Sequence, residues 1–156
     1  MLTVDRVADE YAEIFRNSLD TMQSFIKNSY ATGWHLDEET AEKIANGALK
    51  VARETVEKTI KDHKKDLKNG FKLMIEDITS GREPSPELVA GTLESMSDEV
   101  ISAVRTYAGN EAKNYKPQSI AWFWCHLMEY AAETSFSDVA QLFRKFWNER
   151  HAKVRK

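Results

Sequence analysis

Three side chains that could transfer protons or bind a metal lie close together in the C-terminal third of the sequence. His126, Glu129 and Glu133 are three and four residues apart, so an α-helix would place them on one side. A histidine and a carboxylate at this spacing can share a proton or bind one side of a metal ion. Further ligands would have to come from another helix, where His63 is the only attractive donor. Because buried polar groups usually pair without catalysing a reaction, we expect His126 and Glu129 to form a polar pair at the edge of the core.

The remaining sequence contains few motifs that are typical of enzymes. It has no glycine-rich phosphate loop, no Gly-x-Ser-x-Gly motif and no His-Glu-x-x-His pair. No glutamate precedes a histidine by three residues, which excludes the Glu-x-x-His half-sites of di-iron bundles. Cys125 adjoins His126, but neighbours in a helix point about 100° apart and cannot form a nucleophile–base pair. We therefore predict a buried, inert thiol at Cys125, no cofactor, and a protein that is not an enzyme.

Length and composition indicate one soluble domain. The chain has 156 residues, of which 42% are hydrophobic and 30% charged, and its net charge is −3. This charge disfavours a nucleic-acid-binding protein. The single cysteine is typical of a reducing compartment, and no apolar run is long enough to span a membrane. Early charged residues also interrupt any signal-peptide core, so we expect a cytoplasmic protein.

The elements that would position these side chains are helices. Apolar residues recur at three- and four-residue steps in five segments, and no segment of convincing length alternates as a strand would. The sequence thus predicts an all-α fold, a single helical bundle over residues 1–156. The five predicted helices cover 4–31, 38–79, 86–109, 117–133 and 138–152. A break at Asn69-Gly70, a plausible helix end, would raise the number of helices to six.

Residues that favour helix starts support these bounds. Thr3 and Asp37 can each accept a hydrogen bond from the first turn of the helix that follows. Ser85 precedes Pro86, and proline is favoured at the first helical position. Ser80 to Pro84 is the clearest linker, because it combines glycine and proline between two apolar stripes.

Large aromatic side chains are concentrated in the last two predicted helices. Nine of the sixteen aromatic residues lie between Tyr115 and Trp147, so we expect 117–133 to be the tryptophan-rich central helix of the bundle. Trp122 and Trp124 would point about 160° apart on this helix. Both cannot face one core, and one of them is therefore a candidate for a subunit interface or a ligand pocket.

The C-terminal end is basic, whereas the rest of the chain is acidic. Residues 144–156 contain six Lys or Arg and one acid, a balance of +5, which leaves −8 for residues 1–143. We expect the tail at 150–156 to be a solvated terminus, with contact to an acidic partner surface or weak contact with nucleic acid as the alternatives. No aromatic residue follows Trp147, so the stacking platform of a single-strand-binding protein is missing.

The chain resembles two groups of proteins in general style. Its long amphipathic helices are similar to those of phasins, the coat proteins of polyester storage granules. Its size and all-helical character resemble those of several phage-encoded inhibitors of bacterial defence systems. No motif is shared with either group, so neither resemblance transfers a residue.

These observations favour a non-enzymatic protein that acts by binding another protein, as an adaptor, inhibitor or accessory subunit, and as a homodimer. The partner would present an acidic surface to the last two helices. The predicted contact residues are Trp122, Trp124, Arg144, Lys145, Trp147 and Arg150. The first alternative is a ligand- or metal-binding bundle, or an enzyme, that uses His126, Glu129 and His63. The second alternative is a phasin-like granule or surface coat.

Overall fold

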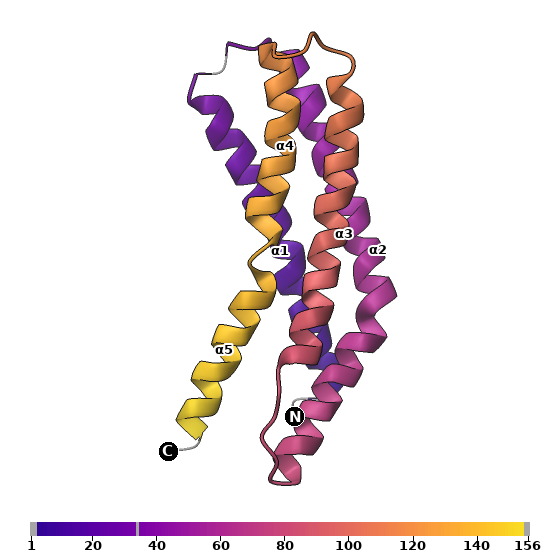
Figure 1. The fold of residues 1–156 in the computed structure, drawn as a ribbon, viewed down its shortest axis with the longest axis vertical. Coiled ribbons are helices and arrows are strands. Elements are labelled where there is room, and N and C mark those ends of the chain that lie inside the picture. The colour runs from indigo at the N-terminus through magenta and orange to yellow at the C-terminus, as the bar shows by residue number, and fades with distance from the viewer. Residues whose placement is uncertain (1–2, 34, 155–156) are drawn as a thin grey trace.

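The computed structural model describes residues 3–33 and 35–154, with side chains described up to residue 149. Five helices account for most of this part of the chain, and none of it forms a strand. The helices are α1 Val4–Ala31, α2 Glu38–Thr79, α3 Glu87–Ala112, α4 Ile120–Phe136 and α5 Val139–Val154. They form a bundle in which α4 and α5 together make one bent arm (Figure 1). The predicted all-α bundle is confirmed.

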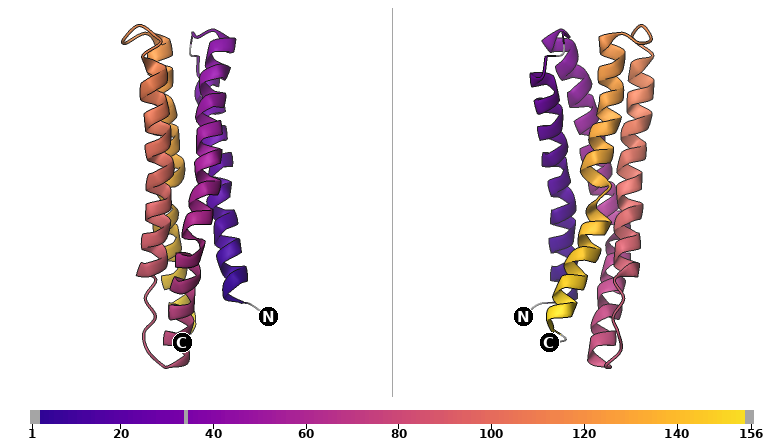
Figure 2. Two further views of the ribbon diagram at one scale, coloured as in Figure 1. Left: turned by 90° about the vertical axis from the view of Figure 1, so that its right-hand side faces the viewer. Right: turned by 60° about the vertical axis from the view of Figure 1, so that its left-hand side comes forward.

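The bent arm of α4 and α5 lies between α1 and α3. The right-hand view of Figure 2 shows this arrangement, with α4 beside the upper part of α1 and α5 beside the lower part. Helices α2 and α3 are neighbours along most of their length (Figure 1). Among the described residues, no helix is both long enough and apolar enough to cross a membrane.

Side-chain caps begin three of the helices. Thr3 Oγ1 accepts a hydrogen bond from Arg6 N at 3.2 Å, and Asp37 Oδ2 accepts one from Thr40 N at 3.1 Å, so both predicted caps are confirmed. Ser119 Oγ accepts from Trp122 N at 3.2 Å and begins α4. These contacts satisfy backbone N–H groups that have no partner within the helix.

Six predicted helix ends differ from the structure, three of them by three residues and the others by one or two. The third helix continues to Ala112, and the fourth covers Ile120–Phe136 in place of 117–133. Its start is delayed because Gln118 adopts a left-handed conformation with φ of 66°, which cannot continue a helix. Its end is extended because Phe136 is fully buried, with its ring 5.4 Å from that of Phe15. Burial of this side chain outweighs the poor helix propensity of the residues before it.

Helix α2 is continuous through Asn69-Gly70, so the break considered there is not present. A Cβ atom on Gly70 would come within 2.7 Å of Val89 Cγ2 on α3. A second glycine of α2, Gly47, lies against the Tyr107 ring, and a Cβ there would overlap the hydroxyl. Both glycines therefore permit close approach of α3 to α2, which is a packing role and not a helix end.

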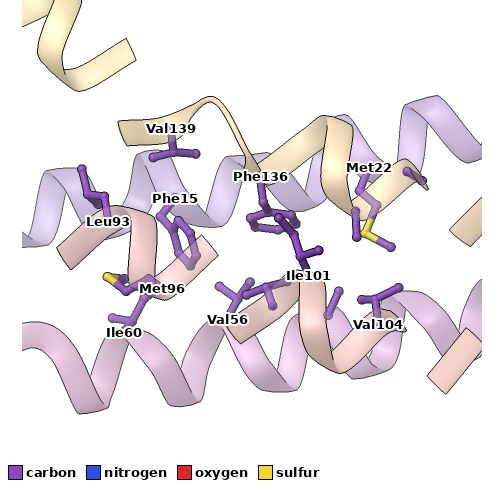
Figure 3. Close-up of a cluster of buried hydrophobic side chains, with 14 of the residues drawn as sticks. Phe15, Met22, Val56, Ile60, Leu93, Met96, Ile101, Val104, Phe136 and Val139 are labelled. Atoms are coloured by element: carbon purple, nitrogen blue, oxygen red, sulfur yellow. The ribbon is translucent and has the colours of Figure 1, made fainter. Parts of the chain in front are cut away.

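The core runs along the whole bundle. Phe15, Val56 and Phe136 are fully buried and come from α1, α2 and α4, as Figure 3 shows. At the lower end, Phe143 of α5 packs edge-on against Tyr11, with ring centroids 5.0 Å apart, and lies 6.0 Å from Phe71. Because α5 contributes buried residues, it is an integral part of the bundle.

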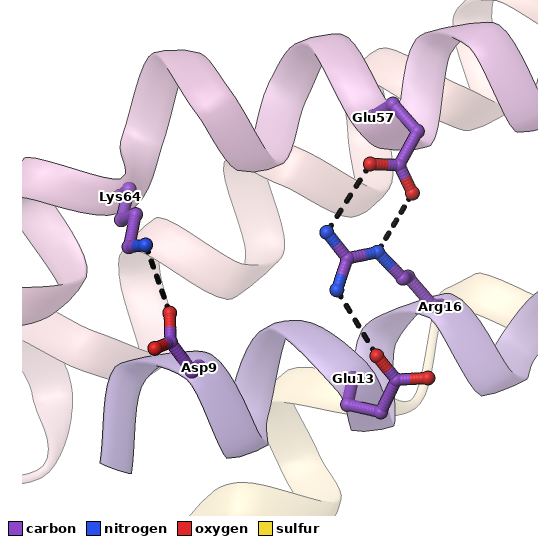
Figure 4. Close-up of polar contacts among 5 residues, drawn as sticks. All are labelled: Asp9, Glu13, Arg16, Glu57 and Lys64. Atoms are coloured by element: carbon purple, nitrogen blue, oxygen red, sulfur yellow. Dashed lines mark hydrogen bonds and ion pairs between the residues drawn. The ribbon is translucent and has the colours of Figure 1, made fainter. Parts of the chain in front are cut away.

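Ion pairs join the outer edges of α1 and α2. Arg16 Nε donates to Glu57 Oε1 at 2.7 Å and Arg16 Nη1 to Glu13 Oε2 at 3.0 Å, while Lys64 Nζ lies 2.9 Å from Asp9 Oδ1 (Figure 4). The hydrogen bond from Arg16 lowers the pKa of Glu57. These pairs are exposed and screened by solvent, so each stabilises the fold only weakly.

Candidate interaction surface on α4 and α5

The two tryptophans at the start of α4 have opposite environments. Trp124 is 1% exposed, and its Nε1 donates to the carbonyl oxygen of Ala41 at 3.1 Å. Trp122 is only partly buried, and its ring lies 4.3 Å from that of His126 and 4.9 Å from that of Phe123. Trp124 is therefore a core residue that a partner cannot reach. Trp122 lies at the outer edge of the helix.

Four large side chains follow one line along the outer side of α4. Ile120, Phe123, Leu127 and Tyr130 are separated by three, four and three residues, the spacing of a coiled-coil seam. Ile120 is 44% exposed, Phe123 49% and Tyr130 57%, while Leu127 is partly buried. We call these four residues the α4 seam.

Helix α1 borders the α4 seam with aromatic contacts. The ring of Phe25 on α1 lies 5.6 Å from that of Tyr130 in the seam, and on the inner side of α4 the ring of Tyr30 lies 5.7 Å from that of the core residue Trp124. Phe25 itself is partly buried against the core. The contact between Phe25 and Tyr130 thus extends the α4 seam onto α1.

None of the four seam residues is among the contact residues predicted from the sequence. The predicted fourth helix is apolar nearly all round, so its inner and outer stripes have the same three- and four-residue spacing. A heptad register starting at Ile120 would have revealed the outer stripe as a second set of apolar positions. Which stripe faces solvent depends on the neighbouring helices.

Glu129 is paired with α3 and not with His126. Arg105 Nε donates to Glu129 Oε1 at 2.7 Å, and this hydrogen bond raises the pKa of Arg105. The His126 Nδ1 atom lies 4.0 Å from Glu129 Oε2, which is too long for a hydrogen bond. The expected His126–Glu129 pair is therefore at most a weak electrostatic contact, and the carboxylate serves to connect α4 to α3.

His63 has its own partners between α2 and α3. Its Nε2 lies 3.2 Å from Glu99 Oε2, and its Nδ1 lies 3.7 Å from Asp66 Oδ2. The buried Thr59 hydroxyl donates to the same Glu99 oxygen at 2.5 Å, and this bond lowers the pKa of the carboxyl. His63 and His126 share none of these contacts. In the part of the chain that the structure describes, no three His, Cys, Asp or Glu side chains are placed to hold a metal ion.

Cys125 is fully buried. Burial raises the pKa of its thiol to about 11. A thiol in this environment stays protonated and is a poor nucleophile near neutral pH. The predicted burial of Cys125 is confirmed.

The basic residues of α5 have different roles. Arg144 Nε and Nη2 each donate to a carboxylate oxygen of Glu87 at 3.2 Å, and Nη2 lies 3.7 Å from Glu94. Its charge therefore joins α5 to α3, and the hydrogen bonds raise its pKa. Lys145 is exposed. The side chain of Arg150, like the rest of the basic tail at 150–156, lies outside the residues whose side chains are described.

Two exposed apolar side chains flank Lys145 on α5. Leu142 is 63% exposed and Phe146 46%, and with Lys145 they occupy positions i, i+3 and i+4 of one helix side. We call these three residues the α5 patch. Trp147 is partly buried against the core next to this patch.

Comparison with protein-family models, with curated proteins and with solved structures found no match to this chain.

Proposed function

We propose that this protein acts by binding another protein through the outer surface of α4 and α5, without catalysing a reaction. One observation carries the proposal. In the described part of the chain, ten large apolar side chains are exposed, and five of them lie on these two helices. The five are Ile120, Phe123, Tyr130, Leu142 and Phe146.

The energetic argument rests on the area that a partner would cover. An aromatic side chain presents about 150–250 Å², so the exposed half of Phe123 or Tyr130 is roughly 100 Å². Covering that area contributes about 2.5 kcal/mol at 25 cal/mol per Å² before the costs of association. Helix α4 also contains no Lys or Arg. Aromatic enrichment and charge depletion are the compositional features of interface centres.

The charge of the α5 patch favours an acidic partner. Lys145 lies between Leu142 and Phe146, whereas Arg144 is already paired with Glu87. A basic rim beside apolar anchors speeds encounter with an acidic surface. Trp122 and Trp147, at the edges of the two surfaces, would extend the contact. This combination supports an adaptor, inhibitor or accessory subunit.

The proposal is tested by affinity purification from cells that express the protein naturally, with quantitative mass spectrometry of what is retained. Phe123→Glu and Leu142→Glu each place a charge on the proposed surface. Leu73→Glu is the matched control, because Leu73 is similarly exposed, at 48%, but lies on a different helix, α2.

We expect proteins bound by the wild type to be lost from Phe123→Glu or Leu142→Glu and retained by Leu73→Glu, at unchanged circular dichroism. Retention of the same proteins by all three variants would contradict the proposal. If Phe123→Glu and Leu142→Glu instead lost only the ability to float with lipid vesicles, the result would indicate a surface coat.

A further inference from the structure

We infer that the α4 seam is the contact between two copies of this chain, which pair α4 against α4 in antiparallel orientation about a twofold axis. The inference rests on the proposed function, because it assigns an occupant to part of the same surface. It assigns no second copy to the exposed α5 patch, where a different protein would bind.

The spacing of the α4 seam suits an antiparallel pair. In such pairs, the first apolar position of each heptad of one helix packs against the fourth position of the other. With the axis near residue 125, Ile120 packs against Tyr130 of the second copy, and Phe123 packs against Leu127 of the second copy. All four seam residues of both copies then have a partner. The same register applies to each chain, as a twofold contact requires.

The charges beside the seam are segregated in a way that favours this orientation. Residues 113–128 contain two lysines, Lys113 and Lys116, and no acid. Residues 129–138 contain three acids and no Lys or Arg. A parallel pair would place like charges together at both ends. An antiparallel pair brings the acidic end of each α4 to the basic start of the other.

Glu133 is the acid best placed for this contact. It is exposed, whereas Glu129 is already bonded to Arg105. In the proposed register, Glu133 lies opposite the segment around Lys116 and Ser119 of the second copy. That segment is the N-terminal end of α4, where the helix dipole also attracts a carboxylate.

The available area indicates a weak, reversible dimer. The three exposed seam residues present roughly 300 Å² per copy, taking about 100 Å² for each, against the roughly 800 Å² per partner of a standard interface, and the partly buried Leu127 adds little. The α1 edge around Phe25 would enlarge the contact. We therefore expect dissociation in the micromolar range.

Sedimentation velocity of the full chain from about 5 to 300 μM tests the dimer. We expect a monomer–dimer equilibrium in wild type and in Leu73→Glu, and a monomer throughout in Phe123→Glu. Lys116→Glu and Glu133→Lys should each weaken the dimer about fivefold, and their combination should restore it, because the charge pair is reversed but kept. A wild type that stays monomeric at 300 μM, or a dimer unchanged by Phe123→Glu, would overturn the inference.

The orientation is tested by oxidative crosslinking in a Cys125→Ala background. An antiparallel pair predicts that His126→Cys, near the axis, forms a disulfide-linked dimer. It predicts that Ile120→Cys alone and Tyr130→Cys alone do not, whereas a mixture of these two variants does. Crosslinking of Ile120→Cys with itself would show a parallel pair and refute the proposed orientation.

The two proposals can fail separately. If the wild type is monomeric but Phe123→Glu still loses bound proteins in the affinity purification, the surface binds other proteins and the self-association is wrong. If the dimer forms and no bound protein depends on Phe123 or Leu142, the self-association holds and the proposed binding of another protein is wrong.

Discussion

Gly47 of α2 provides a sharp test of how α2 and α3 pack. Replacing it with alanine would place a Cβ atom on top of the Tyr107 hydroxyl, which now donates to the carbonyl oxygen of Ile44 at 3.0 Å. The Tyr107 ring carbons closest to the hydroxyl would also be too close to this Cβ atom. A change of side-chain torsion that moved only the hydroxyl could not relieve the overlap. The whole ring must shift, or α3 must move away from α2.

Three contributions determine the size of the effect. Overpacking of a well-packed contact typically costs about 1–3 kcal/mol. Loss of the hydrogen bond from Tyr107 to Ile44 costs about 1 kcal/mol more. Alanine gains about 1 kcal/mol over glycine inside a helix. We therefore expect Gly47→Ala to lower the free energy of unfolding by about 1–3 kcal/mol. For a domain of this size, that corresponds to a fall in Tm of roughly 2–12 °C.

The assay is thermal and urea unfolding followed by circular dichroism at 222 nm. Gly91→Ala is the matched control, because Gly91 lies inside α3 and a Cβ atom there would meet nothing within 4 Å. The free energy of unfolding of Gly91→Ala should rise by about 1 kcal/mol from helix propensity alone. Opposite shifts of the two variants would support the packing of Tyr107 against Gly47. A Gly47→Ala protein stabilised as much as Gly91→Ala would refute it.

Two further predictions concern buried side chains. Trp124→Phe removes the hydrogen bond to Ala41 and leaves a gap in the core, so it should lower the free energy of unfolding by about 2 kcal/mol. In the same urea titration, Trp122→Phe at the partly exposed edge should lower it by less than about 1 kcal/mol. The second prediction concerns pH, because burial raises the pKa of Cys125 from 9.0 to about 11 and that of Tyr107 from 10.0 to about 12. Folding therefore favours the neutral forms of both groups. The free energy of unfolding should fall as the pH rises from about 9 to 12. Urea midpoints at each pH check this. Cys125→Ala should remove the loss between pH 9 and 10 and reduce the loss between pH 10 and 11, where Tyr107 also contributes.

The sequence alone was sufficient for the helices themselves. The predicted bounds 4–31 and 38–79 agree with α1 and α2, because apolar periodicity and the caps Thr3 and Asp37 are local signals. Helix ends without such a signal were less accurate. The end of α4 depends on the burial of Phe136 against Phe15 of α1, a contact between residues far apart in the chain.

The candidate surface depended on information that no single helix contains. Periodicity correctly separated Trp122 from Trp124 by about 160°, since that angle is a property of one helix. Which of the two is buried was decided by Ala41 and Tyr30, which pack against Trp124 from α2 and α1. For the same reason, the sequence could not distinguish the outer stripe of α4 from its inner one.

The pairing of charged side chains was likewise determined by the tertiary structure and not by the sequence alone. Composition revealed a basic end and an acidic body, but it could not assign partners to individual charges. Arg144 is paired with Glu87, 57 residues away, and Glu129 with Arg105, 24 residues away. Spacing along one helix determines which side chains share a face. The packing of all the helices together sets the rotation of each helix against its neighbours. That rotation determines whether a given face lies in the core, forms ion pairs with another helix or stays exposed.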